Sequence, residues 1–367
     1  MTSVLVINSG SSSIKYQLFD GDDKQLLAGV IERVKDHNEA IEQLLQTMKA
    51  DESFIEPDVI GHRVVHGGER FSKPSLITKA VLQEITHLIP LAPLHNPGNI
   101  AGIEACLEAF PDTPQVAVFD TAFHQSMPAS SYRYPIDEAI ADKHGIRKYG
   151  FHGTSFSFVT EKTAEFLGKN PEDINLVILH LGNGASACAV KNGESFDTSM
   201  GLTPLAGLVM GTRSGDIDPA VVFYLNREAG MDISEIDKLL NSESGLRGMA
   251  GNSDMRDVME ASLNDSKASE ALEVYRHRIV FYLSGFAGLL GEVDAVVLTA
   301  GIGENSKQFR EFLFQDNPLG VDLDKGLNDS SNAKARLISS ETSKIPLLVV
   351  PTNEELEIAR QSRMASF

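Results

Sequence analysis

The sequence predicts an α/β protein of two related lobes, and two observations carry this prediction. Apolar runs typical of strands alternate with helical patterns along nearly the whole chain, which indicates α/β architecture. A hairpin pattern with a polar turn occurs near the N-terminus, as VLVINSGSSSIKYQLFD, and again in the middle of the chain, as NLVILHLGNGASACAV. The recurrence predicts an internal duplication, with a cleft between the two lobes.

The strand predictions rest on short apolar runs and on period-two alternation. In the first hairpin these are Val4–Asn8 and Ile14–Phe19, and in the second they are Leu176–Leu181 and Ser186–Val190. A third apolar run ends in a turn within DAVVLTAGIGENS, Asp294–Ser306.

Helical periodicity occurs between the predicted strands, at 39–49, 100–109, 157–167, 218–229 and 269–290. No low-complexity linker marks the lobe boundary. We place it near 123–135, where HQSMPASSYRYP interrupts the pattern.

Composition narrows the class of protein. The chain has 367 residues, 42% of them hydrophobic, which suits a soluble protein with a large core. No apolar run reaches the roughly 18 residues of a membrane span. The N-terminal residues show no basic region or small-residue cleavage site, so a secretory signal is not expected. Cys106 and Cys188 have no metal or disulfide spacing, which favours a reducing cytoplasm.

The formal net charge of −19 argues against nucleic acid or an anionic membrane as a partner. If the substrates are anions, the site has to concentrate Arg, Lys and His side chains against this acidic background. Those residues are therefore the first candidates for function.

The turn NSGSSSIK of the first hairpin resembles a phosphate loop but lacks the G-x-x-x-x-G-K-[ST] order and precedes a strand. Its backbone N–H and hydroxyl groups can form a concavity for an anion, although an ordinary tight turn is the better explanation of this turn alone. The second turn, HLGNGAS, strengthens the phosphate interpretation, because Gly182 and Gly184 permit close backbone approach to a ligand and His180 precedes them.

Basic residues gather in GHRVVHGGERF, which holds His62, Arg63, His66 and Arg70, while GTRSGDIDP holds Arg213. An Arg in a loop is usually a solvated surface residue. Arg63 has glycines on both sides and is followed by an apolar pair, so its planar guanidinium suits a bidentate grip on a carboxylate or phosphate.

Asp120 ends the apolar run VAVFD, and α/β proteins place functional side chains at the carboxyl ends of strands. A helix N-cap or turn aspartate is an equally good explanation of Asp120 alone. His124 and His152 follow in FDTAFHQSMP and YGFHGTS, where a lone histidine is more often structural than catalytic. The glycine turn in TAGIGENS is a weak signal for a nucleotide.

Taken together, these segments resemble the acetate kinase family. The matching strings run in order over most of the chain: INSGSSSIKY, GHRVVHGGERF, PLAPLHNPGN, VFDTAFHQSMP, YGFHGTS, HLGNGAS, DTSMGLTPLAGLVMGTRSGDIDP, LTAGIGENS and PTNEELEIA. The resemblance implies two duplicated ribonuclease-H-like lobes of the actin-like ATPase type with an interlobe cleft. It implies an N-terminal lobe, made of 1–124 and 356–367, that binds the acid and contains part of the phosphate site. The C-terminal lobe, 125–355, would bind the nucleotide and dimerise.

The activity that the resemblance implies is reversible, ATP-dependent phosphorylation of acetate to acetyl phosphate, by in-line transfer of the γ-phosphoryl group to the acetate carboxylate. Mg²⁺ is the expected metal, with Mn²⁺ as a substitute, and ATP and ADP are co-substrates. The family resemblance also implies a cytoplasmic homodimer.

Site residues carry over position by position. The expected catalytic residues are Asp120, Arg63, His152, Arg213 and His180. The expected acid-binding residues are Arg63, Val65, Leu94, His95, Phe151 and Pro204. The expected nucleotide-binding residues are Lys15, His180, Leu181, Gly182, Asn183, Gly184, Asp254, Met255, Arg256, Gly301, Ile302, Gly303, Glu304 and Asn305. The expected metal ligands are Asn8 and Glu354.

Acetate is already an anion at neutral pH, so its oxygen can attack phosphorus without a general base. We therefore expect Asp120 to orient Mg²⁺ or an arginine rather than to take a proton.

Two departures from the family pattern are visible. Phe156 replaces a second histidine in HGTSF, and the segment between Val34 and Ala40 is shorter than in the family, which we interpret as a trimmed peripheral elaboration. A propionate or butyrate kinase remains the nearest alternative, because one methylene discriminates by only ~1 to 3 kcal/mol. A nucleotide-driven interaction protein of the actin or heat-shock-chaperone kind is the alternative of another class.

Overall fold

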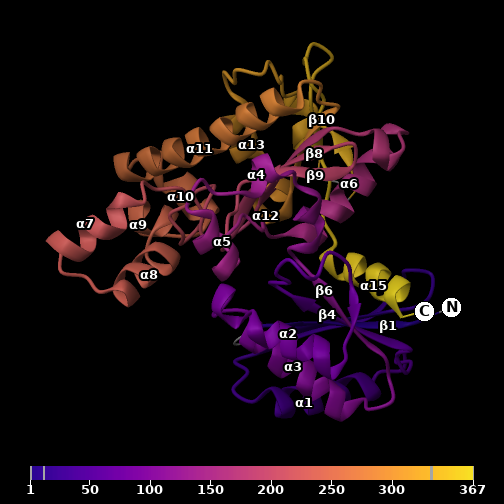
Figure 1. Cartoon of the computed structure of the whole chain (residues 1–367). Helices are drawn as coiled ribbons and strands as arrows, with labels where there is room; N and C mark the ends of the chain where they lie inside the picture. The colour runs from indigo at the N-terminus through magenta and orange to yellow at the C-terminus, as the bar shows by residue number, and fades with distance from the viewer. Residues whose placement is uncertain (1, 11–12, 331–333, 367) are drawn as a thin grey trace. The chain divides into compact units, whose positions relative to one another are not determined.

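The structure is a computed structural model that describes residues 2–10, 13–330 and 334–366 (Figure 1). The chain forms two compact units: unit 1 comprises Met1–Gln125, Phe151–Phe158 and Asn353–Phe367, and unit 2 comprises Ser126–Gly150 and Val159–Thr352. Unit 1 thus includes 151–158 and 353–355, which the sequence prediction assigned to the second lobe. Hydrogen bonds explain the difference, because Gly153 N donates to Asp120 O at 2.9 Å and Thr154 Oγ1 donates to Glu354 at 3.2 Å.

Unit 1 is built on a mixed sheet with the strand order β3-β2-β1-β4-β6-β5. The strands are β1 Val4–Ser9, β2 Ser13–Phe19, β3 Gln25–Glu32, β4 Val59–Val64, β5 Ser75–Leu76 and β6 Gln115–Phe119. Strands β1, β2 and β3 form an antiparallel meander, β1, β4 and β6 are parallel, and β5 is an antiparallel edge strand. The predicted first hairpin is therefore confirmed, although Ser11 and Ser12 of its turn lie outside the described residues.

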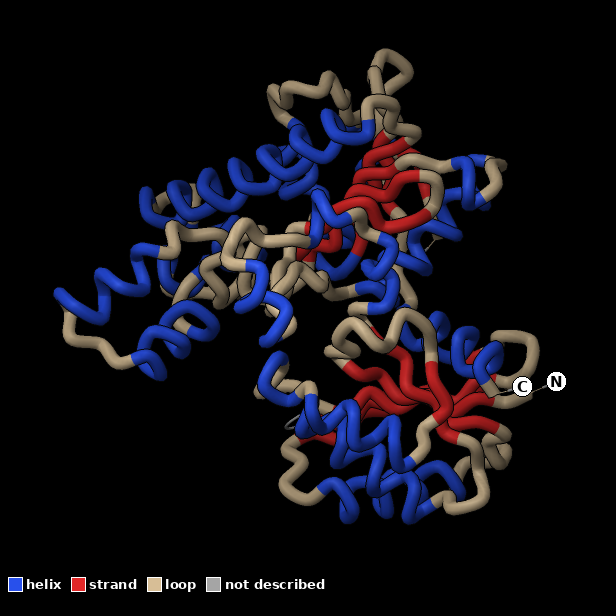
Figure 2. Tube along the Cα trace, in the orientation of Figure 1, coloured by secondary structure: helices blue, strands red, loops and turns tan. Residues whose placement is uncertain are grey.

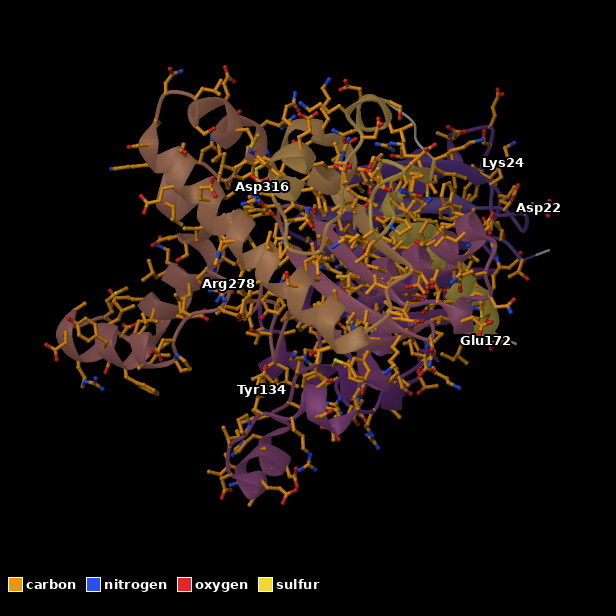
Figure 3. All side chains as sticks on the ribbon, turned by 90° about the horizontal axis from the view of Figure 1, so that it is seen from above. Asp22, Lys24, Tyr134, Glu172, Arg278 and Asp316 are labelled. Atoms are coloured by element: carbon orange, nitrogen blue, oxygen red, sulfur yellow. The ribbon has the colours of Figure 1, made fainter. Side chains whose placement is uncertain are left out.

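Helices cover both faces of the unit 1 sheet (Figure 2). One face packs against α1 His37–Lys49 and α3 Asn96–Ala109, with α2 Lys79–His87 beside α3, and the other packs against α15 Glu354–Ala365. Short 3-10 helices η1 Ile89–Leu91 and η2 Ala122–Ser126 complete this region. In Figure 3, Asp22 and Lys24 extend from the turn that joins β2 to β3, where charge is solvated at low cost.

Unit 2 is built on a second mixed sheet with the order β11-β12-β10-β7-β8-β9. The strands are β7 Leu176–Leu181, β8 Ala185–Lys191, β9 Glu194–Thr198, β10 Ala295–Thr299, β11 Arg336–Leu337 and β12 Leu347–Val349. Strands β7, β8 and β9 form an antiparallel meander, β7, β10 and β12 are parallel, and β11 is an antiparallel edge strand.

The remaining helices are α4 Ala129–Tyr132, α5 Glu138–His144, α6 Gly153–Leu167, η3 Pro171–Asp173, α7 Ala220–Glu228, α8 Ile233–Ser242, α9 Gly245–Ala250, α10 Met255–Ala261, α11 Ser266–Leu290, α12 Ala300–Asn305, α13 Lys307–Phe314 and α14 Lys325–Asp329. Residues 153–158 of α6 belong to unit 1, while the rest of α6 and the other helices of this list belong to unit 2. Each of the five predicted helices exists, with ends that differ from the prediction by at most four residues.

The two sheets have the same topology. In each sheet the first three strands in chain order form an antiparallel meander, and two later strands lie parallel to the first strand of that meander. A short antiparallel strand forms the edge beside the last parallel strand and comes just before it in the sequence. A match of strand order, direction and sequence order in both units confirms the predicted duplication of an α/β lobe. It also places the turn after β1 and the turn after β7 at equivalent positions of their units.

Candidate active site

Arg63 and Asp120 form the centre of the candidate site in unit 1. Arg63 lies near the carboxyl end of β4, and Asp120 directly follows its parallel neighbour β6. Arg63 Nη2 donates to Asp120 Oδ2 at 2.6 Å, and Nε lies 3.0 Å from Oδ1 and 3.1 Å from Oδ2. The Asp120 carboxylate therefore holds the arginine instead of capping a helix.

The two charges differ in exposure: the Asp120 side chain is 1% exposed and that of Arg63 is 23% exposed. Burial raises the pKa of the Asp120 carboxyl group, while the charge of Arg63 opposes this shift by stabilising the carboxylate. Burial also acts to lower the pKa of Arg63, but the charges of Asp120 and Glu354 raise it above its ordinary value. Arg63 is thus a permanent cation whose guanidinium is held by the Asp120 carboxylate and is partly open to solvent.

The two expected metal ligands belong to the same unit. Asn8 lies near the end of β1, and its Oδ1 is 3.4 Å from Arg63 Nη1. Glu354 is the first residue of α15 and accepts a hydrogen bond from Thr154 Oγ1 at 3.2 Å. Lys15 stands opposite Asn8 in the register of β1 and β2 and is exposed. Within the described ranges there is no group of three or more His, Cys, Asp and Glu side chains suited to a metal.

His152 adopts a left-handed backbone, with φ of 59°, in the residue before α6. Such a conformation is uncommon for a residue with a Cβ atom and is found at constrained functional positions. The next residue explains why the chain tolerates it. A Cβ atom at Gly153 would lie 2.2 Å from the carbonyl oxygen of Asp120, so only glycine permits this approach. Gly153, the residue after His152, is thus held against the backbone of Asp120, to whose carbonyl oxygen its N–H donates at 2.9 Å.

The expected acid-binding residues of unit 1 differ in exposure. Val65 is 8% and Phe151 is 2% exposed, and the Phe151 ring meets His66 edge-on at 5.6 Å. His95 precedes α3 and acts electrostatically to lower the pKa of Asp120, although burial dominates. Leu94 is 60% exposed, so in this unit alone it covers little.

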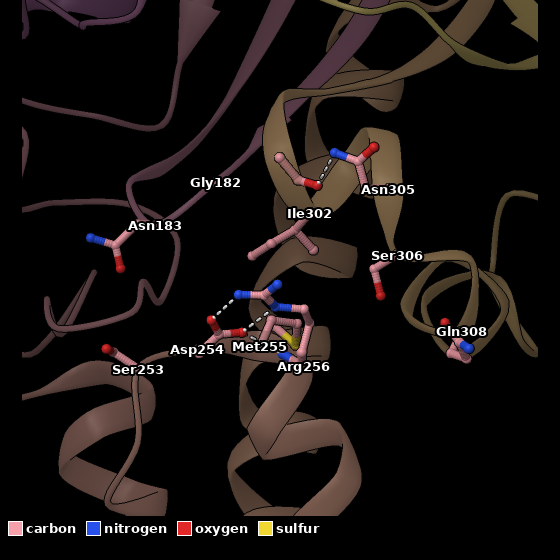
Figure 4. A pocket seen from close by; sticks show the side chains of 11 residues that line it. Gly182, Asn183, Ser253, Asp254, Met255, Arg256, Ile302, Asn305, Ser306 and Gln308 are labelled. Carbon is pink, nitrogen blue, oxygen red and sulfur yellow. Dashed lines mark hydrogen bonds and ion pairs between the residues drawn. The ribbon is translucent and has the colours of Figure 1, made fainter. Parts of the chain in front are cut away.

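Unit 2 contains a pocket of about 710 Å³. Its lining residues come from the turn after β7, from the start of α10, from α12 and from the start of α13 (Figure 4). Eight expected nucleotide-binding residues line it: Gly182, Asn183, Asp254, Met255, Arg256, Gly301, Ile302 and Asn305. Ser253, Ser306 and Gln308 also line the pocket and were missed by the sequence prediction. They flank the predicted segments, so extending each segment by one to three residues finds them.

The pocket contains an ion pair at its rim. Arg256 Nη2 donates to Asp254 Oδ2 at 2.6 Å, and Arg256 Nε donates to Asp254 Oδ1 at 3.0 Å (Figure 4). The side-chain hydrogen bonds from Arg256 lower the pKa of Asp254 to about 2. The Arg256 side chain is 84% exposed, so its flat guanidinium face remains available to a planar ligand group.

Other expected nucleotide-binding residues have different surroundings. His180 and Leu181 are buried at the end of β7, and Gly184 closes the turn by accepting from Gly182 N at 3.1 Å. The Glu304 carboxylate accepts from Ala300 N at 2.8 Å and from the backbone of 352 at 3.1 Å. It therefore fixes the start of α12. A Cβ atom at Gly303 would lie 3.4 Å from the backbone carbonyl carbon of Leu298, the fourth residue of β10.

Arg213 occupies a tight loop of unit 2. Its Nη1 donates to the carbonyl oxygen of Pro204 at 3.1 Å, so these two expected site residues are neighbours. Burial lowers the pKa of Arg213 below its ordinary value. Asp216 closes the loop by accepting from Gly207 N at 2.7 Å and from Tyr282 on α11 at 2.6 Å. Arg213 is therefore presented on a rigid element.

The fold and these sites define a class of protein: a duplicated two-unit α/β protein with an arginine–carboxylate centre in one unit and a large pocket in the other. Comparison with known proteins identifies the particular family. The chain belongs to the acetokinase family, whose model matches residues 30–360.

Individual relatives are similar in sequence to this chain over nearly their full length. The chain is 50% identical to an acetate kinase of Streptomyces griseus over 98% of this chain and 95% of the relative. It is 49% identical to an acetate kinase of Leifsonia xyli over 100% and 99%.

Solved structures show the same relationship. The crystal structure of Porphyromonas gingivalis acetate kinase matches with a TM-score of 0.93 and 38% identity, covering 100% of both chains. That of a propionate kinase from Francisella tularensis matches with a TM-score of 0.94 and 41% identity, covering 99% of this chain and 100% of the other.

Proposed function

We propose that this chain catalyses the reversible, ATP-dependent phosphorylation of acetate to acetyl phosphate. The observation that carries the proposal is the Arg63–Asp120 centre in a chain of the acetokinase family. With a formal charge of −19, the protein has little general attraction for an anionic substrate. A fixed, partly exposed guanidinium supplies that attraction at one point.

Arg63 suits the carboxylate end of the acid. Its Nε and Nη2 donors are directed at Asp120, which leaves Nη1 facing the weakly held Asn8 amide oxygen at 3.4 Å. That edge can donate to an incoming carboxylate. Val65 and Phe151 supply apolar surface in the same unit for the methyl group, and we assign Pro204 of unit 2 and Leu94 to the same task.

Electrostatic stabilisation is the main catalytic requirement, because a carboxylate has to approach a polyphosphate whose charge spreads over three equatorial oxygens. We assign this role to Arg63 and His152 of unit 1 and to Arg213 and His180 of unit 2. By analogy with arginine fingers, loss of one such arginine lowers kcat by ~10³ to 10⁵. Acetate needs no general base, so Asp120 serves to orient Arg63.

The nucleotide is assigned to the pocket of unit 2, whose volume of about 710 Å³ lies within the range of small-molecule sites. The glycines of the turn after β7 and of α12 allow phosphate and ribose to approach the backbone. Met255 and Ile302 offer apolar surface, and the exposed guanidinium face of Arg256 offers a stacking surface for the base. Lys15 of unit 1 is assigned to a phosphate.

Mg²⁺ fits the donors present, since Asn8, Asp120 and Glu354 offer the oxygen atoms that this hard cation prefers. We assign Asn8 and Glu354 as its protein ligands, with Mn²⁺ as a substitute. Mg²⁺ usually takes its other ligands from phosphate and water, which agrees with the small number of acidic side chains here. When bound, it neutralises phosphate charge.

The test is acid-dependent turnover. With ATP, Mg²⁺ and acetate, the protein is expected to release ADP and to form an acyl phosphate that hydroxylamine traps as a hydroxamate. ADP release at the same rate without any short carboxylic acid would instead indicate an ATPase of the actin or heat-shock-chaperone kind. Acetate-dependent ADP release without a trapped hydroxamate, or hydroxamate formation only from a longer acid, would contradict acetate as the substrate.

A propionate kinase is the second candidate, because a solved structure of a propionate kinase matches this chain as well as an acetate kinase does. One methylene in an apolar pocket changes specificity by only ~1 to 3 kcal/mol. The values of kcat/KM for formate, acetate, propionate and butyrate with ATP decide between the two. We expect the maximum at acetate, with propionate accepted.

A homodimer is the proposed assembly. Unit 2 exposes large apolar side chains on α7, α8 and α11, namely Phe223, Tyr224, Ile233 and Phe281, each at least 60% exposed. Exposed apolar surface of this kind is typical of interaction sites. Sedimentation at micromolar concentration is expected to give twice the mass of the chain.

We also propose a cytoplasmic location. Cys106 and Cys188 are buried free thiols, and burial raises the pKa of each to about 12. Unpaired thiols are typical of a reducing compartment. Among the helices of the described chain, none has the length and apolar character needed to cross a bilayer.

A further inference from the structure

The side chain of Asn99 joins two strands that carry site residues. Asn99 lies on α3 and is 4% exposed. Its Nδ2 donates to the carbonyl oxygen of Ser9 at 2.6 Å, and its Oδ1 accepts from the backbone N–H of Val65 at 3.1 Å. Ser9 follows the expected metal ligand Asn8, and Val65 lies two residues beyond Arg63.

This bridge begins where the backbone ladder ends. Strands β1 and β4 are parallel neighbours, and the last pair in their register is Ile7 with His62. Asn8 and Arg63 come directly after that pair, so the ladder does not fix their separation. A side-chain amide has one donor and one acceptor group in a fixed geometry, and can replace the next rung of a sheet.

Helix α3 holds Ser9 in two further ways. The Ser9 hydroxyl donates to the carbonyl oxygen of Gly98 at 2.9 Å. A Cβ atom at Gly102 would lie 2.5 Å from Ser9 Cβ, so the glycine allows the strand end to approach the helix. The helix therefore supports Ser9, at the start of the candidate phosphate turn, at three points: Gly98, Asn99 and Gly102.

We propose that Asn99 is a positioning residue that fixes the spacing between the turn after β1 and Arg63. The proposal rests on the proposed function, since this spacing separates the groups assigned to phosphate and metal from the group assigned to the acid. We assign Asn99 no contact with a substrate, because it is buried and both ends of its side-chain amide bond to the backbone. Its loss acts on the relative placement of the reacting groups, and a misplacement of about 1 Å can lower the rate ~10²-fold.

The matched control is Asn96, a second buried asparagine on the same helix. Its Oδ1 accepts from His66 N and its Nδ2 donates to His66 O, both at 3.2 Å. Asn96 thus holds the segment after β4 without contact to Ser9. The substitutions Asn99→Asp and Asn96→Asp each exchange one amide donor for an oxygen next to a backbone carbonyl, so both destabilise the fold in the same manner.

The first readout is steady-state kinetics of acetyl phosphate formation. Asn99→Asp is expected to lower kcat by ~10- to 10²-fold with less than about a threefold change in KM for acetate or ATP, whereas Asn96→Asp keeps kcat within about threefold. Should Asn99→Asp not fold, Gly102→Ala displaces the same turn without touching Asn99 and is expected to give the same pattern. Equal losses of kcat in Asn99→Asp and Asn96→Asp, or an effect confined to KM, would overturn the proposal.

The second readout does not need turnover. Hydrogen exchange of the Gly10 amide, which donates to Ser13 O at 2.8 Å, reports whether the turn is held. Asn99→Asp is expected to lower its protection by at least about tenfold relative to Asn96→Asp. Equal protection in both variants overturns the proposed bridge. If the wild-type protein forms no acyl phosphate, the proposed function fails while this measurement still decides the role of Asn99.

Discussion

The substitution Asp120→Asn tests the Arg63–Asp120 centre most directly. The new side chain has the same shape but no charge, and its amide group would face the Arg63 donors that now lie 2.6 to 3.1 Å from the carboxylate. Breaking one partner of a buried ion pair costs ~3 to 5 kcal/mol of unfolding free energy. Because water reaches Arg63, which is 23% exposed, we expect the lower end, about 3 kcal/mol.

The kinetic effect follows from the loss of orientation. A guanidinium that the Asp120 carboxylate no longer holds misplaces the acid. We expect this to lower kcat/KM for acetate ~10²-fold at every Mg²⁺ concentration. The measurement is hydroxamate formation over a Mg²⁺ titration, with unfolding in urea measured in parallel. Turnover close to that of the wild type over the whole range of Mg²⁺ would refute the assigned role.

The control is Asp23→Asn in the same unit. Asp23 lies in the turn between β2 and β3, between Asp22 and Lys24 in the sequence. It accepts from Arg360 Nε at 2.7 Å and also pairs with Arg363. We expect a lower free energy of unfolding and an unchanged kcat. If Asp23→Asn lowers kcat as much as Asp120→Asn, the loss is general and not specific to the site.

Two further predictions concern stability. His62 is 1% exposed and bonded to Gln115 at 2.8 Å, and burial lowers its pKa to about 4, so the unfolded state binds more protons between about pH 4 and 6.5. The folded state should therefore lose about 2 kcal/mol from this group between pH 7 and 5, and urea unfolding of His62→Gln should lack that part of the loss. Gly153→Ala, whose Cβ meets the carbonyl oxygen of Asp120 at 2.2 Å, should lower both Tm and kcat, whereas Gly285→Ala, which has open space in helix α11, should stabilise by ~0.5 to 1 kcal/mol. Calorimetry of the two alanine variants checks both signs, and a destabilised Gly285→Ala would show that this surface is covered in the assembly.

Periodicity explains what the sequence could predict. The strands of both hairpins alternate or are continuously apolar, so β1, β2, β7 and β8 were found within one residue at each end. Strand β4 was missed because VIGHRV mixes apolar residues with His62 and Arg63, and a strand buried on both faces carries no alternation. The polar residues of β4 indicated the candidate site, but they interrupted the apolar pattern from which the strand could have been predicted.

The residues that hold the candidate site residues in place were not predicted, for a different reason. Thr154 and Asn99 form hydrogen bonds to Glu354, 200 positions later in the chain, and to Ser9, 90 positions earlier. No local pattern encodes contacts of this range, since one depends on the approach of α6 to α15 and the other on the packing of α3 against β1. The candidate residues that spacing could reveal are those that lie on one turn, such as Gly182 and Asn183.

The segment that leads into α1 contacts the turn after β1. The alignment of the whole chain with the Leifsonia relative runs over 393 positions, whereas this chain has 367 residues. The relative therefore has positions without a counterpart in this chain. In this chain Asp36 caps α1 by accepting from 38 and 39, and His37 Nε2 then lies 3.1 Å from the carbonyl oxygen of Gly10. Gly10 belongs to the turn assigned to phosphate. The shortened connection therefore brings the His37 side chain to that turn, while the interpretation of the absent segment as a peripheral elaboration stays a prediction. Since Asn99 already holds Ser9 from α3, the turn after β1 is supported from two helices that are far apart in sequence. Rigid support of this kind is what a phosphate site made mainly of backbone groups requires.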